Sequence, residues 1–229
     1  MKKTIIIAAS IVLAGAMLPV SVARLKSYDR TVDVKGRCEK EVHADKVIWP
    51  LTYKVVGNDL NAALREIESD NAVVMSFLRD GGVADADITV KAPDISDKYA
   101  SEYGNNDRVY RYLCTCVITV CTSDVDKVLS LQTKLSDLMK KGIALTTNDW
   151  QNQTQFKFEA LNDIKPEMIE EATANAREAA RKFAQDSGSR LGKIKTATQG
   201  TFSIEDRDTN TPYIKKVRVV TYVTYYLNR

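Results

Sequence analysis

The chain has 229 residues, of which 44% are hydrophobic and 28% are charged. This length and composition suit one large domain or two smaller lobes with buried cores, and they exclude a disordered protein. The formal net charge is +3. Without residues 1–23, which hold Lys2 and Lys3 and no acid, it falls to +1 (31 bases against 30 acids). A nearly neutral body lacks the clustered positive field that phosphate binding needs, so we expect no nucleic-acid partner.

The N-terminus has the pattern of an export signal. Lys2 and Lys3 precede an uncharged run at residues 4–23, which ends in Ser21-Val22-Ala23. The small residues fit a cleavage site, but a run of about twenty residues is also long enough to span a membrane. Two alternatives therefore stay open: a cleaved signal, or an inner-membrane anchor that tethers the protein through residues 4–23. Both predict that the chain after Arg24 lies in the periplasm or cell envelope.

The first half of the chain alternates strands and helices. Residues 31–42 begin as a strand that either ends near Gly36 or continues weakly, and residues 45–56 form a better strand with a single apolar face. Pro50 lies inside this second strand, which predicts an edge position or a bulge. A helix follows from a cap at Asn58 to Gly81-Gly82. The remaining elements are a short strand at 87–91, a polar hairpin tip at 93–107, a central strand at 108–121 and a helix at 124–141.

The second half contains the clearest helix. A strand at 153–161 precedes a helix at 164–191, which Asn162 or Asp163 would cap and Gly188 would end. Its apolar residues recur every third or fourth position, as on one buried helix face. They are Met168, Ile169, Ala172, Ala176, Ala179, Ala180, Phe183, Ala184 and Leu191. Runs at 193–204 and 213–227 then form a hairpin.

This order predicts an α+β fold made of repeated β-α-β-β units, with helices packed on mixed or antiparallel sheets. The two lobes would span about 45–121 and 153–227, joined by the helix at 124–141.

Signatures of catalysis are absent from the sequence. It has no G-x-S-x-G, no phosphate-binding loop and no H-E-x-x-H. His43 is the one histidine, and a lone histidine has no partner placed by sequence. The acid groups Asp85 with Asp87, and Glu205 with Asp206 and Asp208, fall in turns, where acids are common for backbone reasons. We therefore expect no catalytic residue, no cofactor, no metal and no enzymatic activity.

The four cysteines are Cys38, Cys114, Cys116 and Cys121. Outside the cytoplasm an even count favours disulfides, but Cys114 and Cys116 lie on one strand face, a poor geometry for bridging each other. Three alternatives stay open: a bridge from Cys38 to another cysteine, a soft-metal site at Cys114 and Cys116, or free packed thiols. In the polar tip, Tyr99 and Tyr103 are aromatic residues of the kind that form contacts with another chain.

Long ungapped stretches resemble the SIMPL-domain family of exported bacterial proteins, from about Arg30 to the C-terminus. The stretches are Val34-Lys35-Gly36, EVHADKVIWPL at 41–51, IKPEMIEEATANAREAA at 164–180 and KFAQDSGSRLGKI at 182–194. The segment at 203–221 is similar to the Bacteroidota-type branch. The resemblance implies an α+β fold, a periplasmic or envelope location, assembly into homo-oligomers, and a link to envelope and oxidative-stress tolerance. It implies no catalytic residue.

The first hypothesis is therefore a non-enzymatic exported SIMPL-domain protein that self-associates and supports envelope homeostasis or stress resistance. The alternative is a periplasmic ligand- or metal-binding module, with a site lined by the long loops and by Cys114 and Cys116. An enzyme of unrecognised type is a third hypothesis.

Overall fold

The protein is described by a computed structural model that places residues 30–100, 109–146 and 150–228. The chain divides into two compact units. We call the described residues 30–41, 161–205 and 216–228 the α5 unit, and the described residues within 42–160 together with 206–215 the α2 unit. Each described unit combines helix with antiparallel sheet, which confirms the predicted α+β class.

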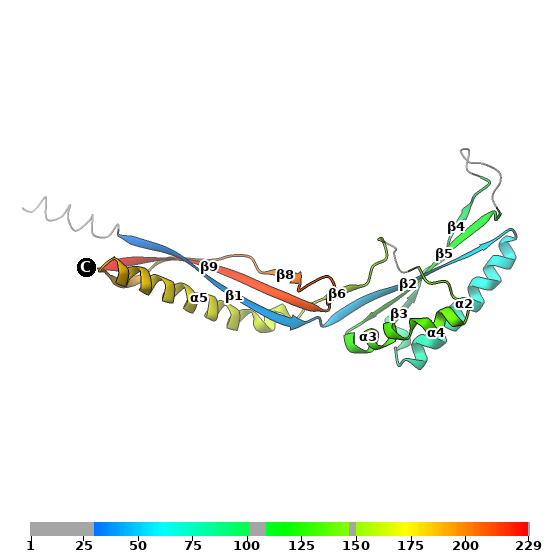
Figure 1. Cartoon of the computed structure of the whole chain (residues 1–229), viewed down its shortest axis with the longest axis horizontal. Helices are drawn as coiled ribbons and strands as arrows, with labels where there is room; N and C mark the ends of the chain where they lie inside the picture. Colours follow the sequence, from blue (N-terminus) through cyan, green and yellow to red (C-terminus); the bar gives the residue numbers. More distant parts are fainter. Residues whose placement is uncertain (1–29, 101–108, 147–149, 229) are drawn as a thin grey trace, which may run out of the picture. The chain divides into compact units, whose positions relative to one another are not determined.

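In the α5 unit, one long helix covers one face of a sheet (Figure 1). The sheet order is β1-β9-β7, and β8 also pairs with β9. Its strands are β1 (Thr31–His43), β7 (Arg190–Gln199), β8 (Ser203–Asp206) and β9 (Ile214–Asn228). The helix is α5 (Leu161–Asp186), and its buried residues are mainly alanines: Met168, Ala172, Ala176, Ala180 and Ala184. Small side chains at this spacing let the helix lie close to the sheet.

Gly36 is a point where β1 and α5 approach each other very closely. A Cβ built there would lie 1.8 Å from the carbonyl oxygen of Ala172 and 2.5 Å from the backbone nitrogen of Ala176. No side chain fits this space, so the residue must be glycine for the helix to keep its position.

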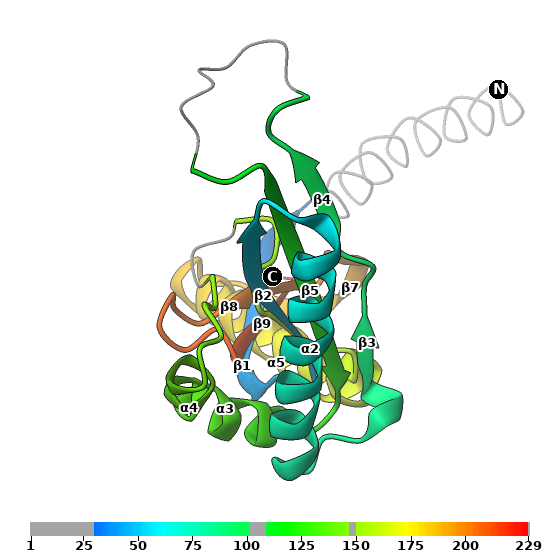
Figure 2. The ribbon, with the colours of Figure 1, turned by 90° about the vertical axis from the view of Figure 1, so that its right-hand side faces the viewer.

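The α2 unit places three helices on a five-stranded sheet (Figure 2). The sheet order is β3-β5-β2-β6, and β4 also pairs with β5. The strands are β2 (Lys46–Gly57), β3 (Ile88–Val90), β4 (Asp94–Asp97), β5 (Tyr112–Thr122) and β6 (Gln155–Lys157). The helical elements are α2 (Leu60–Asp80), α3 (Val125–Thr133), α4 (Leu135–Lys140) and the 3-10 turn η1 (Asp85–Asp87).

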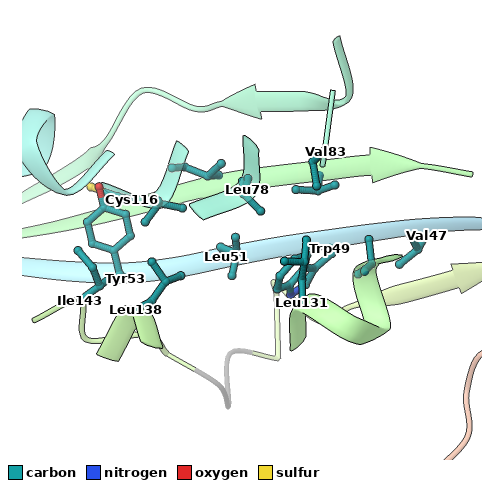
Figure 3. Packing of buried hydrophobic residues seen from close by; sticks show 14 of the residues in the cluster. Val47, Trp49, Leu51, Tyr53, Leu78, Val83, Cys116, Leu131, Leu138 and Ile143 are labelled. Carbon is teal, nitrogen blue, oxygen red and sulfur yellow. The ribbon is translucent and has the colours of Figure 1, made fainter. Parts of the chain in front are cut away.

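The register of β2 against β5 separates a core face from an outer face. Trp49 lies opposite Val120, Leu51 opposite Ile118, and Tyr53 opposite Cys116. All six residues are buried, and they pack against apolar residues of the helices, such as Leu78 and Leu131 (Figure 3). Because strand side chains alternate, the residues between them point to the other face of the sheet.

Pro50 occupies an edge position, as the sequence predicts. Strand β6 pairs with β2 only from Lys46 to Ile48. The carbonyl oxygen of Thr52 accepts a hydrogen bond from the Thr146 nitrogen on the side of β2 away from β5. Pro50 is two residues from Thr52, so its backbone nitrogen, which carries no hydrogen, also faces the side of β2 away from β5. Strand β6 does not extend to this position, so no hydrogen bond between strands is lost there.

Several predicted helix limits were wrong. Asp59, not Asn58, caps α2, because its carboxylate accepts from the Ala62 nitrogen at 2.7 Å. Asn58 instead bonds the backbone of Val109 and Arg111. The predicted helix at 124–141 is broken at Lys134 into α3 and α4.

The long helix also differs from its prediction at both ends. It begins at Leu161 and ends at Asp186, and Gly188 follows with a φ of 62°. Phe183, which the stripe places on the buried face, is 60% exposed, and Leu191 belongs to β7.

The two units do not coincide with the lobes predicted at 45–121 and 153–227. The predicted linking helix packs inside the α2 unit as α3 and α4. The α5 unit is instead closed by pairing of the N-terminal strand β1 with the C-terminal strand β9. The Leu227 nitrogen donates to the Arg30 carbonyl, and the Thr224 hydroxyl donates to Asp33. No local pattern in the sequence indicates so distant a pairing.

Candidate functional site

All four cysteines are free thiols in the structure. Cys38 lies on β1, where it is 2% exposed, and its Sγ donates a hydrogen bond to Oε2 of Glu171 on α5 at 3.1 Å. Burial and the Glu171 carboxylate raise the pKa of the Cys38 thiol to about 11. A thiol with so high a pKa is protonated at neutral pH and is a weak nucleophile.

Cys114 and Cys116 lie on the core face of β5, and burial raises the pKa of both thiols. Tyr53 lies opposite Cys116 (Figure 3). Its hydroxyl donates to Oδ1 of Asn71 on α2 at 2.8 Å. Among the described residues, no group of three or more His, Cys, Asp or Glu residues is placed to hold a metal ion. The soft-metal alternative therefore gains no support here. Sequence reasoning missed Asn71, because nothing local pairs it with Tyr53.

His43 is exposed at the end of β1, and its ring centroid lies 6.4 Å from that of Tyr213. The predicted acid groups have structural partners. Asp85 accepts from the Arg79 guanidinium at 2.7 Å, and Asp206 pairs with Lys215. Asp208 accepts from the Asn210 and Thr211 nitrogens, and hydrogen bonds from Thr211 and Arg207 lower its pKa to about 2. Asp208 therefore stabilises a turn, whereas Asp85 and Asp206 form ion pairs with neighbouring elements.

Tyr99 is 51% exposed, and the Arg111 guanidinium lies 5.9 Å from its ring centroid. Arg111 also forms an ion pair with Asp97 at 2.8 Å, which ties the start of β5 to the end of β4. Tyr103, the other predicted contact residue, lies outside the described residues. The same is true of the predicted leader at 1–23.

The β7 edge, residues 193–199, is an exposed strand edge in the α5 unit. Strand β7 has ten residues and pairs only with β9, so its other side is an edge of the sheet. Every residue of the β7 edge is exposed, including Ile194, which is 42% exposed. An exposed edge strand presents unpaired N–H and C=O groups on which another strand can pair. The β7 edge is therefore the candidate association surface.

No helix within the described part of the chain is long and apolar enough to cross a membrane. A search of curated proteins finds no match to the chain. A family model named SIMPL, described as a protein of unknown function (DUF541), matches residues 32–224, which is most of the chain. The protein therefore belongs to the SIMPL (DUF541) family.

Proposed function

We propose that this SIMPL-domain protein is exported, has no enzymatic activity, and self-associates to support envelope homeostasis or resistance to oxidative stress. The observation that supports self-association is the β7 edge. This strand pairs with β9 on one side only, and its residues are exposed on both faces of the sheet. The leader at residues 1–23 would direct export and then be cleaved or stay as an inner-membrane anchor.

Charge along the β7 edge favours one mode of self-pairing. Lys193 and Lys195 lie in its first half, and no lysine or arginine lies in residues 196–199. Parallel pairing in register would place lysine beside lysine, which is repulsive. Antiparallel pairing about a two-fold axis places the lysines of one copy opposite the neutral half of the other. We therefore infer an antiparallel, two-fold contact between β7 strands.

Thr198 provides a matched pair of test variants. Thr198 lies opposite Tyr222 of β9. The Lys195 ammonium lies 5.6 Å from the ring centroid of Tyr226. Tyr222 and Tyr226 are four residues apart on β9, so their side chains point to the same face of the sheet. Thr198 and Lys195 therefore share that face. Thr198→Lys adds a charge that repels the partner subunit's Lys195, and Thr198→Glu adds one that attracts it. Thr198 is exposed, so neither change disturbs the core.

The function is tested in a strain that lacks the gene and is complemented with wild type, Thr198→Lys or Thr198→Glu. Survival in peroxide and in detergent is measured, with fractionation of the cells to locate each protein. We expect loss of resistance in the deletion strain, rescue by wild type and Thr198→Glu, and weaker rescue by Thr198→Lys. Unchanged survival of the deletion strain, or recovery of the protein from the cytoplasm, would contradict the proposal.

A further inference from the structure

A row of polar residues crosses the outer face of the sheet in the α2 unit, which is the face opposite α2. Lys54 of β2 and Asp94 of β4 both lie directly opposite Thr115 of β5, one on each side. Adjacent strands are about 4.8 Å apart, so the backbones at Lys54 and Asp94 are about 10 Å apart. The row therefore carries a positive group at one end, a hydroxyl in the middle and a negative group at the other end.

A cavity of about 370 Å³ lies over this row. Its lining includes Lys54, Lys91, Asp94, Thr115 and the amide side chains of Gln151 and Asn152. A second cavity of about 310 Å³ shares Thr146 and Asn152 with the first and includes Thr52 and Gln132. Volumes of this size are at the lower end of the range for small-ligand sites.

The charged groups of the first cavity are not paired with one another. Within the described residues Lys54, Lys91 and Asp94 form no ion pair, although other lysines of the unit do. Lys46, for example, pairs with Glu159 at 3.2 Å. Three unpaired charges of both signs around one cavity can bind a ligand that carries both signs.

Thr52 supplies an independent observation at the second cavity. It is 2% exposed, and its Oγ1 has no hydrogen-bond partner. A buried polar atom without a partner destabilises the folded state and is uncommon in folded proteins. Thr52 and Lys54 point to the same outer face because they are two residues apart on β2. The unpaired hydroxyl and the unpaired charges thus belong to one surface.

We propose that this surface binds the backbone of a short peptide of two or three residues with free termini. Its carboxylate would be bound by Lys54, its ammonium by Asp94, and its amide groups by Thr115 and the side-chain amides. Two to three extended residues span about 7–10 Å, which matches the separation of the backbones at Lys54 and Asp94. A single amino acid is too short to reach both ends. This binding is separate from the β7 edge and does not depend on self-association.

The test is calorimetric titration of the purified full-length protein with di-alanine and tri-alanine. N-acetylated, C-amidated di-alanine, which has no terminal charge, is the control ligand. We expect binding of the free peptides with a Kd below about 1 mM and none of the blocked peptide. Lys54→Met and Asp94→Asn should each weaken binding about tenfold, since each removes one charged contact. Lys141→Met, an exposed lysine that lines neither cavity, should bind as wild type does.

Three results would overturn the proposal: no heat with either free peptide, equal binding of the blocked peptide, or unchanged affinity in Lys54→Met and Asp94→Asn. Binding of acetate that depends on Lys54 but not Asp94, without peptide binding, would show a simple anion site instead. The melting temperature of each variant checks that it folds, and Lys54→Gln replaces Lys54→Met if that variant does not.

Discussion

Gly36 on β1 and Ala172 on α5 approach so closely that a Cβ on Gly36 would lie 1.8 Å from the Ala172 carbonyl oxygen. The helix backbone therefore rests directly on the strand backbone. Ala176 and Ala180 continue this contact, each with 0% of its surface exposed. Helix α5 can lie this close to β1 only because Gly36 has no side chain. The α5 unit therefore tolerates little added volume at Gly36.

Replacement of Gly36 by alanine should destabilise the α5 unit. The added methyl meets backbone atoms that cannot rotate away, and overpacking of this kind costs about 1–3 kcal/mol. Gly57→Ala is the matched control, because a Cβ there would lie 3.7 Å from its nearest neighbour. Denaturant unfolding measures both. Equal stability of Gly36→Ala and wild type would show that α5 does not pack as described.

Alkaline pH should destabilise the protein partly through Cys38. Its pKa is raised from 9.0 to about 11 in the folded state, so folding favours the protonated thiol. This contribution is fully present below about pH 9 and is lost as pH rises towards about 11. The unfolding free energy of Cys38→Ala should therefore fall less steeply across this window than that of wild type. Parallel profiles for the two proteins would contradict the raised pKa.

The four thiols should differ in their rate of alkylation by iodoacetamide. Cys38, Cys114 and Cys116 are each no more than 2% exposed, whereas Cys121 is exposed on β5. We expect one thiol to react rapidly in the folded protein and three to react only after unfolding. Cys121→Ser should remove the rapid reaction. Mass spectrometry of the quenched protein counts the labels, and two or more rapid labels would be inconsistent with the buried positions.

Asp59 should contribute to stability as the N-cap of α2. Its carboxylate satisfies the Ala62 N–H at 2.7 Å, and loss of such a cap costs about 0.5–2 kcal/mol. Asp59→Ala should lower the unfolding free energy by this amount. Asn61→Ala, in the same exposed first turn, should change it by less than about 0.5 kcal/mol. A similar loss in both variants would argue against a specific cap.

The sequence predicted the helices and strands better than it predicted how they pack together. Periodicity located α2, α5, β2 and β5, because apolar spacing is a local property. It also predicted either an edge position or a bulge at Pro50, and the structure shows that β6 does not pair with β2 there. It failed at Phe183, where the stripe continues in sequence but the residue is 60% exposed. A helical pattern does not say where the covering sheet stops.

Contacts between segments far apart in the sequence could not be predicted either, because apolar spacing is a local property. The pairing of β1 with β9 determines how the chain divides into two units, yet the sequence of neither strand indicates which strand it pairs with. The β7 edge was also missed as a surface, since a strand pattern does not reveal which side stays unpaired. Among the groups of the peptide site, Lys54 and Asp94 are 40 positions apart and share Thr115 only through the sheet register.

Self-association through the β7 edge is tested most directly by light scattering on the purified protein across a concentration series. Wild type should have at least twice the mass of one chain, Thr198→Lys should shift towards one chain, and Thr198→Glu should keep or strengthen the assembly. A mass of one chain for wild type at all concentrations, or identical masses for the two variants, would contradict the account.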